Sequence, residues 1–209
     1  SPGAAGTVTA NLRALGVNVL PLGVVGDDGE GYELKRALRA IGVDAALLIE
    51  SADRFTPTYT KPMRQEASHG SEWHELNRLD IKNRIPLPAK LEDAIITQLR
   101  NALPGVQGAV IVDQVSEADC GVITERVRLE LCAQARAHPD RVLAADSRER
   151  IGLFQDVILK CNVREPVRAA FPAGDPTDQR LVEACGTMLA ARARRPVFVT
   201  VGAEGIWLF

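Results

Sequence analysis

Oxygen-bearing residues and glycines stand where the apolar segments of this sequence end. In chain order these ends are Gly26-Asp27-Asp28, Asp113, Asp146, Lys160-Cys161-Asn162 and Thr200-Val201-Gly202. Carboxylate and amide oxygens suit a magnesium ion, and glycines allow backbone N–H groups to approach phosphates closely. At the carboxyl ends of strands in an open α/β sheet, such residues stand where ligands bind. Taken singly, each residue is more readily explained by a helix cap or a tight turn.

The segments between these ends predict alternating strands and helices. Apolar strands are expected at 17–25, 108–113, 141–146, 156–160 and 196–201. Helices are expected at 3–15, 32–42, 89–103, 117–137, 164–170 and 177–194. Asp27, with Glu30 three residues later, is expected to cap the second helix. The alternation predicts an α/β fold with a parallel sheet covered on both faces, in which ligands bind beyond the carboxyl ends of the strands.

Residues 45–80 differ in character from the rest of the chain. Thr, Tyr, Phe and Trp occur there in short alternating runs, which are separated by Pro57, Pro62 and Gly70. This pattern favours short strands in an exposed, partly amphipathic sheet.

Composition narrows the functional classes. The 209 residues are 46% hydrophobic and 25% charged, which is typical of a globular chain with one substantial core. The 25 basic and 27 acidic side chains are interspersed, so nucleic acid is not expected as a partner. Four widely spaced cysteines without a CxxC pair favour reduced thiols. No apolar stretch reaches the roughly 20 residues of a membrane span, and "SPGAAG" does not read as a secretion signal, so we expect a cytoplasmic protein without a membrane partner.

Four ordered motifs resemble those of the ribokinase-like (PfkB) carbohydrate kinases. The first is the small-residue segment "PGAAGTVTANLRALG", whose Gly16 precedes Gly26 by the ten residues usual in that family. The others are "VGDDGEG", similar to VGxDxxG; "KCNVRE", similar to NxxE; and "TVGAEG", similar to TxGxxG. Within the family, "TPTYTKPMR", "ELNRLD" and "DSRERIG" look most similar to the heptose kinase branch, the kinase domain of ADP-heptose synthase.

The resemblance implies a three-layer α/β/α fold with a mostly parallel central sheet and a small β-sheet lid. Residues 1–44 would begin the kinase core, 45–80 would form most of the lid, and 81–209 would continue the core with the nucleotide site. In such kinases the lid excludes water that would compete as the phosphoryl acceptor. The implied cofactors are ATP and Mg²⁺, and the implied substrate is a small sugar.

The resemblance also assigns candidate site residues. The residues expected to bind the nucleotide are Lys160, Asn162, Glu165, Thr200, Gly202 and Gly205, of which Asn162 and Glu165 would also organise the magnesium ion. The residues expected to bind the substrate are Gly3, Thr7, Asp28, Asp113 and Asp146. Thr7 stands where the family usually has Asn, and this exchange leaves the identity of the sugar open.

The catalytic base of the family is not found in this sequence. In the family the strand that begins at "GIWLF" leads to a GAGD segment, whose Asp is the general base, and no GAGD occurs in the 209 residues. The first strand of the family, with its sugar-contacting Asp, is not found either. We therefore expect an internal fragment of a kinase, lacking both ends and inactive by itself, and assign no catalytic residue.

Three other functions share parts of this pattern. A non-catalytic nucleotide- or sugar-binding module could keep the fold without the base, and nucleoside kinases share fold and motifs. A dinucleotide-binding enzyme would need GxGxxG, whereas "GDDGEG" carries acidic residues where a pyrophosphate must approach. Exposed lid strands can pair between subunits, so a homodimer through the lid is an open expectation.

Overall fold

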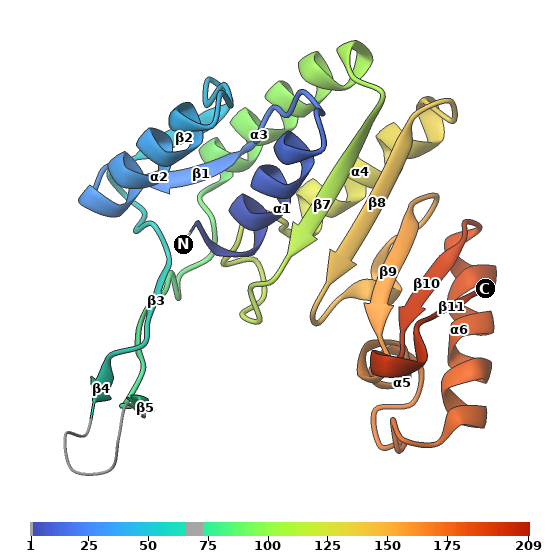
Figure 1. Ribbon diagram of the computed structural model, residues 1–209. Coiled ribbons are helices and arrows are strands. Elements are labelled where there is room, and N and C mark those ends of the chain that lie inside the picture. Colours follow the sequence, from blue (N-terminus) through green and yellow to red (C-terminus); the bar gives the residue numbers. More distant parts are fainter. Residues whose placement is uncertain (1, 66–72) are drawn as a thin grey trace. The chain divides into compact units, whose positions relative to one another are not determined.

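The chain divides into two compact units, Ser1–Ile85 and Pro86–Phe209. The computed structural model describes residues 2–65 and 73–209 (Figure 1). Both units combine helices with strands, and the expected α/β class is confirmed.

The first unit begins with two helices and a short parallel strand pair. Its elements are α1 (Gly3–Ala14), β1 (Gly23–Gly26), α2 (Gly29–Ala40) and β2 (Leu48–Ser51). Strand β1 pairs in parallel with β2, and α2 makes the crossover between them. The strand expected at 17–25 is only four residues long. Asp28, and not Asp27, caps α2, because its carboxylate accepts a hydrogen bond from the backbone N–H of Gly31.

The rest of the first unit forms two antiparallel strand pairs. They are built from β3 (Thr58–Thr60) with β6 (Leu79–Ile81), and β4 (Met63–Gln65) with β5 (Trp73–Glu75). These are the short strands expected from the alternating pattern, while Gly70 lies outside the described residues. Since β2 belongs to the parallel pair, the antiparallel strands occupy 58–81 within the segment expected to form the lid.

The second unit holds a five-stranded sheet. Its elements are α3 (Ala89–Ala102), β7 (Gly108–Asp113), α4 (Glu125–Ala137), β8 (Val142–Ser147), β9 (Ile158–Asn162), α5 (Arg164–Ala170), α6 (Gln179–Ala193), β10 (Val197–Thr200) and β11 (Ile206–Leu208). The strand order is β11-β10-β9-β8-β7, with β7 to β10 parallel and β11 antiparallel to β10. The carboxyl ends of the four parallel strands therefore lie along one edge of the sheet.

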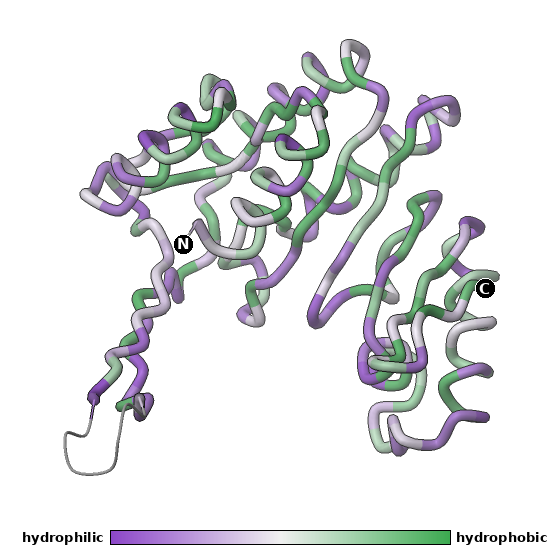
Figure 2. The backbone as a smooth tube through the Cα atoms, in the orientation of Figure 1, coloured by the Kyte–Doolittle hydropathy of each residue, from purple (hydrophilic) through white to green (hydrophobic). Residues whose placement is uncertain are grey.

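Side chains alternate between the two faces of this sheet. Apolar residues on one face are almost fully buried, among them Ile111, Leu143, Leu159 and Val199. Their neighbours along the strands are half-buried or exposed, as Val110 and Val142 are. Figure 2 shows the apolar runs along β7 and β8 and the polar connections at their carboxyl ends. The alternation decides which strand-end side chains face inward.

Helix α4 begins later than its sequence predicts. A helix was expected from about residue 117, but α4 starts at Glu125, after the cap Thr124, whose hydroxyl oxygen accepts from Val127 N–H at 3.3 Å. The backbone carbonyls of Val115 and Ser116 are taken instead by the Arg150 side chain. A helix starting at residue 117 would need some of these groups for its own ladder, so tertiary contacts decide its start.

Within residues 2–65 and 73–209, no helix has the length and apolar character needed to cross a bilayer.

Candidate functional site

Polar side chains from four strands meet along the carboxyl edge of the second unit's sheet. The register places Asp113 opposite Ser147, Asp146 opposite Lys160, and Asn162 opposite Thr200. Five of the residues predicted from sequence thus come from adjacent strand ends. This is the edge at which open α/β sheets bind ligands.

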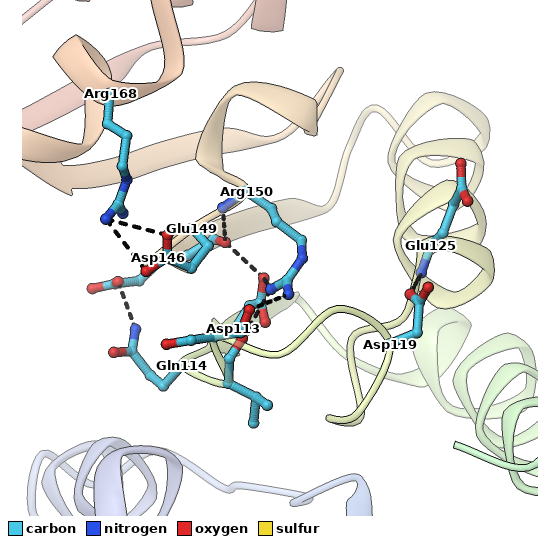
Figure 3. A network of polar contacts seen from close by, with 11 residues as sticks. Asp113, Gln114, Asp119, Glu125, Asp146, Glu149, Arg150 and Arg168 are labelled. Atoms are coloured by element: carbon cyan, nitrogen blue, oxygen red, sulfur yellow. Dashed lines mark hydrogen bonds and ion pairs between the residues drawn. The ribbon is translucent and has the colours of Figure 1, made fainter. Parts of the chain in front are cut away.

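Asp146 joins two neighbours at this edge. Its Oδ1 accepts a hydrogen bond from Gln114 Nε2 at 3.0 Å, and its Oδ2 pairs with Lys160 Nζ at 2.7 Å. Figure 3 shows Gln114 reaching Asp146 from the segment that follows β7. The Lys160 side chain is 48% exposed, so its charge is held at the edge without being buried.

Asn162 and Glu165 form a reciprocal capping arrangement at the start of α5. Asn162 Oδ1 accepts from the backbone N–H groups of Arg164, at 2.9 Å, and Glu165, at 3.3 Å. Glu165 Oε2 accepts from the backbone N–H of Asn162 at 2.8 Å. The helix start therefore fixes both side chains. The other oxygen, Glu165 Oε1, makes no hydrogen bond to any residue in the described parts of the chain.

The surroundings of Glu165 raise the pKa of its carboxyl group above the ordinary glutamate value. Burial raises its pKa, and the nearby charge of Asp146 raises it further. The hydrogen bond from Asn162 N–H and the charges of Lys160 and Arg168 act in the opposite direction. A cation bound to this carboxylate would offset both the desolvation of the charged form and its repulsion from Asp146.

Cys161 lies between Lys160 and Asn162 in β9 but faces the buried side of the sheet. Burial raises the pKa of its thiol to about 12, with a further contribution from Glu165. The thiol therefore stays protonated at neutral pH and cannot act there as a thiolate nucleophile.

Asp113 also faces the buried side and belongs to a second polar group. Its Oδ2 accepts from Ser147 Oγ at 2.6 Å and lies 3.6 Å from Arg150 NH1. Burial raises the pKa of Asp113, against the lowering effect of Ser147, Arg150 and Arg128. The sequence therefore predicted correctly that Asp113 lies at a strand end, but its side chain makes structural contacts in the interior. Its substrate-binding role stays a prediction.

The TxGxxG segment forms the turn between β10 and β11. Gly202 has φ +63° and Gly205 φ +99°, conformations that side chains rarely adopt. Val201 N–H donates to Gly205 O at 2.9 Å and closes the turn. Apart from the adjacent residues in the chain, no atom of the described residues lies within 4 Å of the place where a Cβ would stand on either glycine. Thr200 Oγ1 donates to Cys161 O at 3.3 Å and ties the turn to β9.

Asp28 of the first unit is engaged by the backbone on both oxygens. Oδ1 accepts from Gly31 N–H at 2.7 Å, and Oδ2 accepts from Thr56 N–H at 2.8 Å. Burial acts to raise its pKa, but the hydrogen bonds from Thr56 and Gly31 outweigh it, so the pKa is lowered. Thr56 Oγ1 in turn accepts from Gly26 N–H at 2.8 Å. The contacts of Asp28 in this structure are those of a helix cap, and its substrate role stays a prediction.

The two remaining predicted residues lie at the start of α1. Thr7 Oγ1 donates to the carbonyl oxygen of Gly3 at 2.7 Å, and Gly3 has φ +66°. The Thr7 hydroxyl is exposed and keeps an acceptor lone pair.

Sequence reasoning missed Gln114, Ser147 and Arg150. Gln114 and Ser147 directly follow Asp113 and Asp146, so their place immediately after a strand-end aspartate was an available signal. Arg150 carries no such signal, because its contacts arise only when β7 and β8 lie side by side.

One groove of the second unit lies away from these strand ends. A groove of about 540 Å³ runs between α3 and α4 and is lined by residues that include Ile96, Arg100, Leu129 and Glu130. It contains none of the residues predicted from sequence. We base the site on the strand ends, because the chemistry-bearing side chains converge there.

Comparison with known proteins finds relatives that match most of this chain. The chain is 25% identical to the bifunctional protein HldE of Trichlorobacter lovleyi, over 99% of its length, and 27% identical to that of Geotalea uraniireducens, also over 99%. The HldE protein of Wolinella succinogenes is 34% identical over 68% of the chain. This chain is a homologue of the HldE proteins. It spans 40% of the length of the first two HldE proteins and 27% of the third. No protein-family model matches the chain.

Solved structures of sugar kinases have the same fold as this chain. A fructokinase from Vibrio cholerae superposes with a TM-score of 0.62 at 15% identity, covering 99% of this chain and 69% of the fructokinase. A 2-dehydro-3-deoxygluconokinase from Thermotoga maritima gives 0.65 at 12% identity, covering 99% and 68%. The ribokinase-like sugar kinase fold inferred from the motifs is therefore confirmed.

Proposed function

We propose that this chain forms the nucleotide-binding part of an ATP-dependent carbohydrate kinase, which phosphorylates a hydroxyl of a heptose, hexose or sugar phosphate. The observation that carries the proposal is the convergence of Asp146, Lys160, Asn162 and Glu165 along the strand ends that lead to the glycine turn. The HldE relatives and the sugar kinase folds support the same class of reaction.

Within this proposal the nucleotide lies along the ends of β9 and β10. Lys160 supplies positive charge toward the phosphates, and the open space at Gly202 and Gly205 lets the nucleotide approach the backbone. Thr200, tied to β9, sets the start of the turn.

The residues present fit a magnesium ion that is brought by the nucleotide. Mg²⁺ usually takes one or two carboxylates and completes its shell with water and phosphate oxygens. Glu165 offers one carboxylate oxygen, Oε1, without a hydrogen-bond partner among the described residues, and Asp146 is near enough to perturb the pKa of Glu165. No group of three or more His, Cys, Asp or Glu in the described residues could hold a metal alone. Mg²⁺ would neutralise phosphate charge there.

Substrate binding is assigned to Gly3, Thr7, Asp28, Asp113 and Asp146. Thr7 has a hydroxyl that remains exposed. The carboxylates of Asp28, Asp113 and Asp146 already accept hydrogen bonds from the protein, so a sugar would have to share them or act through their partners.

We assign the general base to a GAGD segment that the 209 residues do not contain, and propose that this chain is inactive alone. The antiparallel pairs at 58–81 are assigned to the sugar lid. Exposed Tyr59, Trp73 and Leu79 on these pairs support a homodimer formed through the lid.

The test is phosphoryl transfer from ATP to a panel of heptoses, hexoses and their phosphates, by the 209-residue chain and by the full-length protein. We expect magnesium-dependent turnover by the full-length protein and none by the chain alone. Turnover by the 209 residues would overturn the assignment of the base. Nucleotide binding by the full-length protein without turnover on any sugar would favour a non-catalytic binding module or a nucleoside kinase. Turnover with nucleosides as acceptors would identify the nucleoside kinase.

A further inference from the structure

Arg150 links three segments at the carboxyl edge of the sheet. Its NH1 donates to Val115 O at 2.9 Å, and its NH2 donates to Ser116 O at 2.8 Å. NH1 also lies 3.6 Å from Asp113 Oδ2. Figure 3 shows the guanidinium reaching from the end of β8 to the segment that follows β7. A planar guanidinium suits such a fork of acceptors, which a lysine ammonium cannot match.

The place of Arg150 is itself fixed. Its backbone N–H donates to Ser147 Oγ at 3.0 Å, and the Ser147 hydroxyl donates to Asp113. The Arg150 side chain is only 13% exposed, so its hydrogen bonds compete little with water. The guanidinium therefore acts as a rigid support for the backbone at Val115 and Ser116.

Gln114 transmits this support to the site. It stands between Asp113 and Val115, the two residues that face Arg150, and its amide donates to Asp146 Oδ1. The opposite oxygen of Asp146 holds Lys160. A half-exposed ion pair such as Lys160–Asp146 fixes its own geometry weakly, because it contributes about 0–1 kcal/mol. The Gln114 hydrogen bond supplies the missing orientation of the carboxylate.

We propose that Arg150 is a positioning residue for the nucleotide site: through the backbone at 115–116 and through Gln114 it orients Asp146, and Asp146 in turn directs the Lys160 ammonium. Arg150 itself touches no nucleotide. The inference rests on the proposed function, since it assigns Lys160 to the phosphates.

The test compares Arg150→Gln and Gln114→Met with the wild-type full-length protein. Arg150→Gln removes the fork and its charge, while Gln114→Met keeps the approximate size of the side chain and removes its amide, including the donor that binds Asp146. We expect a roughly tenfold rise in the KM for ATP in Arg150→Gln, because this variant loses hydrogen bonds from a charged donor. The rise in Gln114→Met should be smaller. The KM for the sugar should stay unchanged in both. A merely structural role would lower the active fraction, and hence kcat, without changing the KM for ATP.

Arg100→Gln is the matched control, because Arg100 also makes a forked contact, with Glu130, but between α3 and α4. It should leave the KM for ATP unchanged. If Arg150→Gln does not fold, Gln114→Met carries the test alone. ATP KM values within twofold of wild type in the folded variants would overturn the inference and leave the proposed function standing. Absence of ATP-dependent turnover in the wild type with every sugar would remove the proposed function, and this inference with it.

Discussion

Two glycine motifs of this chain, "GDDGEG" in the first unit and "TVGAEG" in the second, use the same residue for opposite reasons. A Cβ on Gly26 would collide with the Asp28 carboxylate and stand 2.6 Å from Arg54 O, whereas a Cβ on Gly202 or Gly205 would meet nothing within 4 Å. Gly202 and Gly205 have positive φ, and Gly26 does not. The first motif needs glycine because the chain is crowded there, and the second because the backbone takes an unusual path and leaves space.

This difference predicts a structural role for the first motif and a ligand-binding role for the second. In "GDDGEG" the glycines and Asp28 make contacts with each other and with Thr56, so substitutions there should mainly change stability. In "TVGAEG" the space beside the glycines is open, so substitutions there should affect ligand binding more than stability.

The largest expected effect is on stability, in Gly26→Ala. The new methyl group would stand 2.6 Å from a backbone carbonyl oxygen that has little room to move, and we expect a loss of about 3 kcal/mol in the free energy of unfolding. Gly29→Ala is the control in the same motif, because Gly29 has ordinary φ and open space and begins α2. Urea denaturation should show Gly29→Ala to be neutral or stabilised. Equal losses in both variants would contradict the crowding argument.

Asp28→Asn should cost about 1–2 kcal/mol, because an amide has one acceptor oxygen where the carboxylate uses two. The lowered pKa of Asp28 adds a pH dependence. The unfolded chain binds this proton more readily than the folded chain, so the stabilisation is present above the ordinary aspartate pKa of 3.8 and is lost as the pH falls through the folded pKa. Unfolding followed from pH 6 to pH 2 should show a shallower acid loss in Asp28→Asn. Parallel curves for the two proteins would show that Asp28 is not the group responsible.

Gly202→Ala should cost about 1 kcal/mol of stability, the usual penalty for alanine at positive φ. The same variant should raise the Kd for ATP in the full-length protein at least tenfold, because the methyl group enters space assigned to the nucleotide. Calorimetric titration measures the affinity, and urea denaturation the stability. A stability loss with unchanged ATP affinity would place the nucleotide away from this turn.

The smallest expected change in stability, on the order of 1 kcal/mol or less, is a gain in Glu165→Gln at pH 7. Burial and Asp146 raise the pKa of Glu165, so the folded chain binds this proton more readily than the unfolded chain. The stability of the wild type therefore falls as the pH rises from the ordinary glutamate pKa of 4.5 through the folded pKa, and the glutamine variant lacks this loss. The Gln oxygen can still accept from Asn162 N–H. The measurement is thermal denaturation of both proteins at pH 4 and pH 7. A Glu165→Gln variant less stable than the wild type at both pH values would contradict this explanation.

The sequence predicted the elements that local residues determine. Strand β7 and helix α5 have the expected bounds, because a continuous apolar run ends at Asp113 and because the Asn162–Glu165 capping pair starts the helix. The start of α4 was wrong by eight residues, since Arg150 takes the carbonyls of Val115 and Ser116 and a distant contact overrides local helix preference.

The candidate site shows the same limit of local reasoning. Asp146, Lys160 and Asn162 were predicted together because parallel strands share one carboxyl edge, and Glu165 was added by the resemblance to the NxxE motif. The inward direction of Asp113 follows from its alternation with the buried Ile111, a signal that was present in the sequence. The role of Arg150 depends on strands distant in sequence, so local patterns could not reveal it, whereas Gln114 was indicated only by its place after a strand-end aspartate.

The most direct test of the account is a calorimetric titration of the full-length protein with ATP, with and without Mg²⁺, in the wild type, Glu165→Gln and Lys160→Met. We predict binding that Mg²⁺ strengthens in the wild type, no magnesium effect in Glu165→Gln, and at least tenfold weaker binding in Lys160→Met. Equal ATP affinities and equal magnesium effects in all three proteins would contradict a nucleotide site at the ends of these strands.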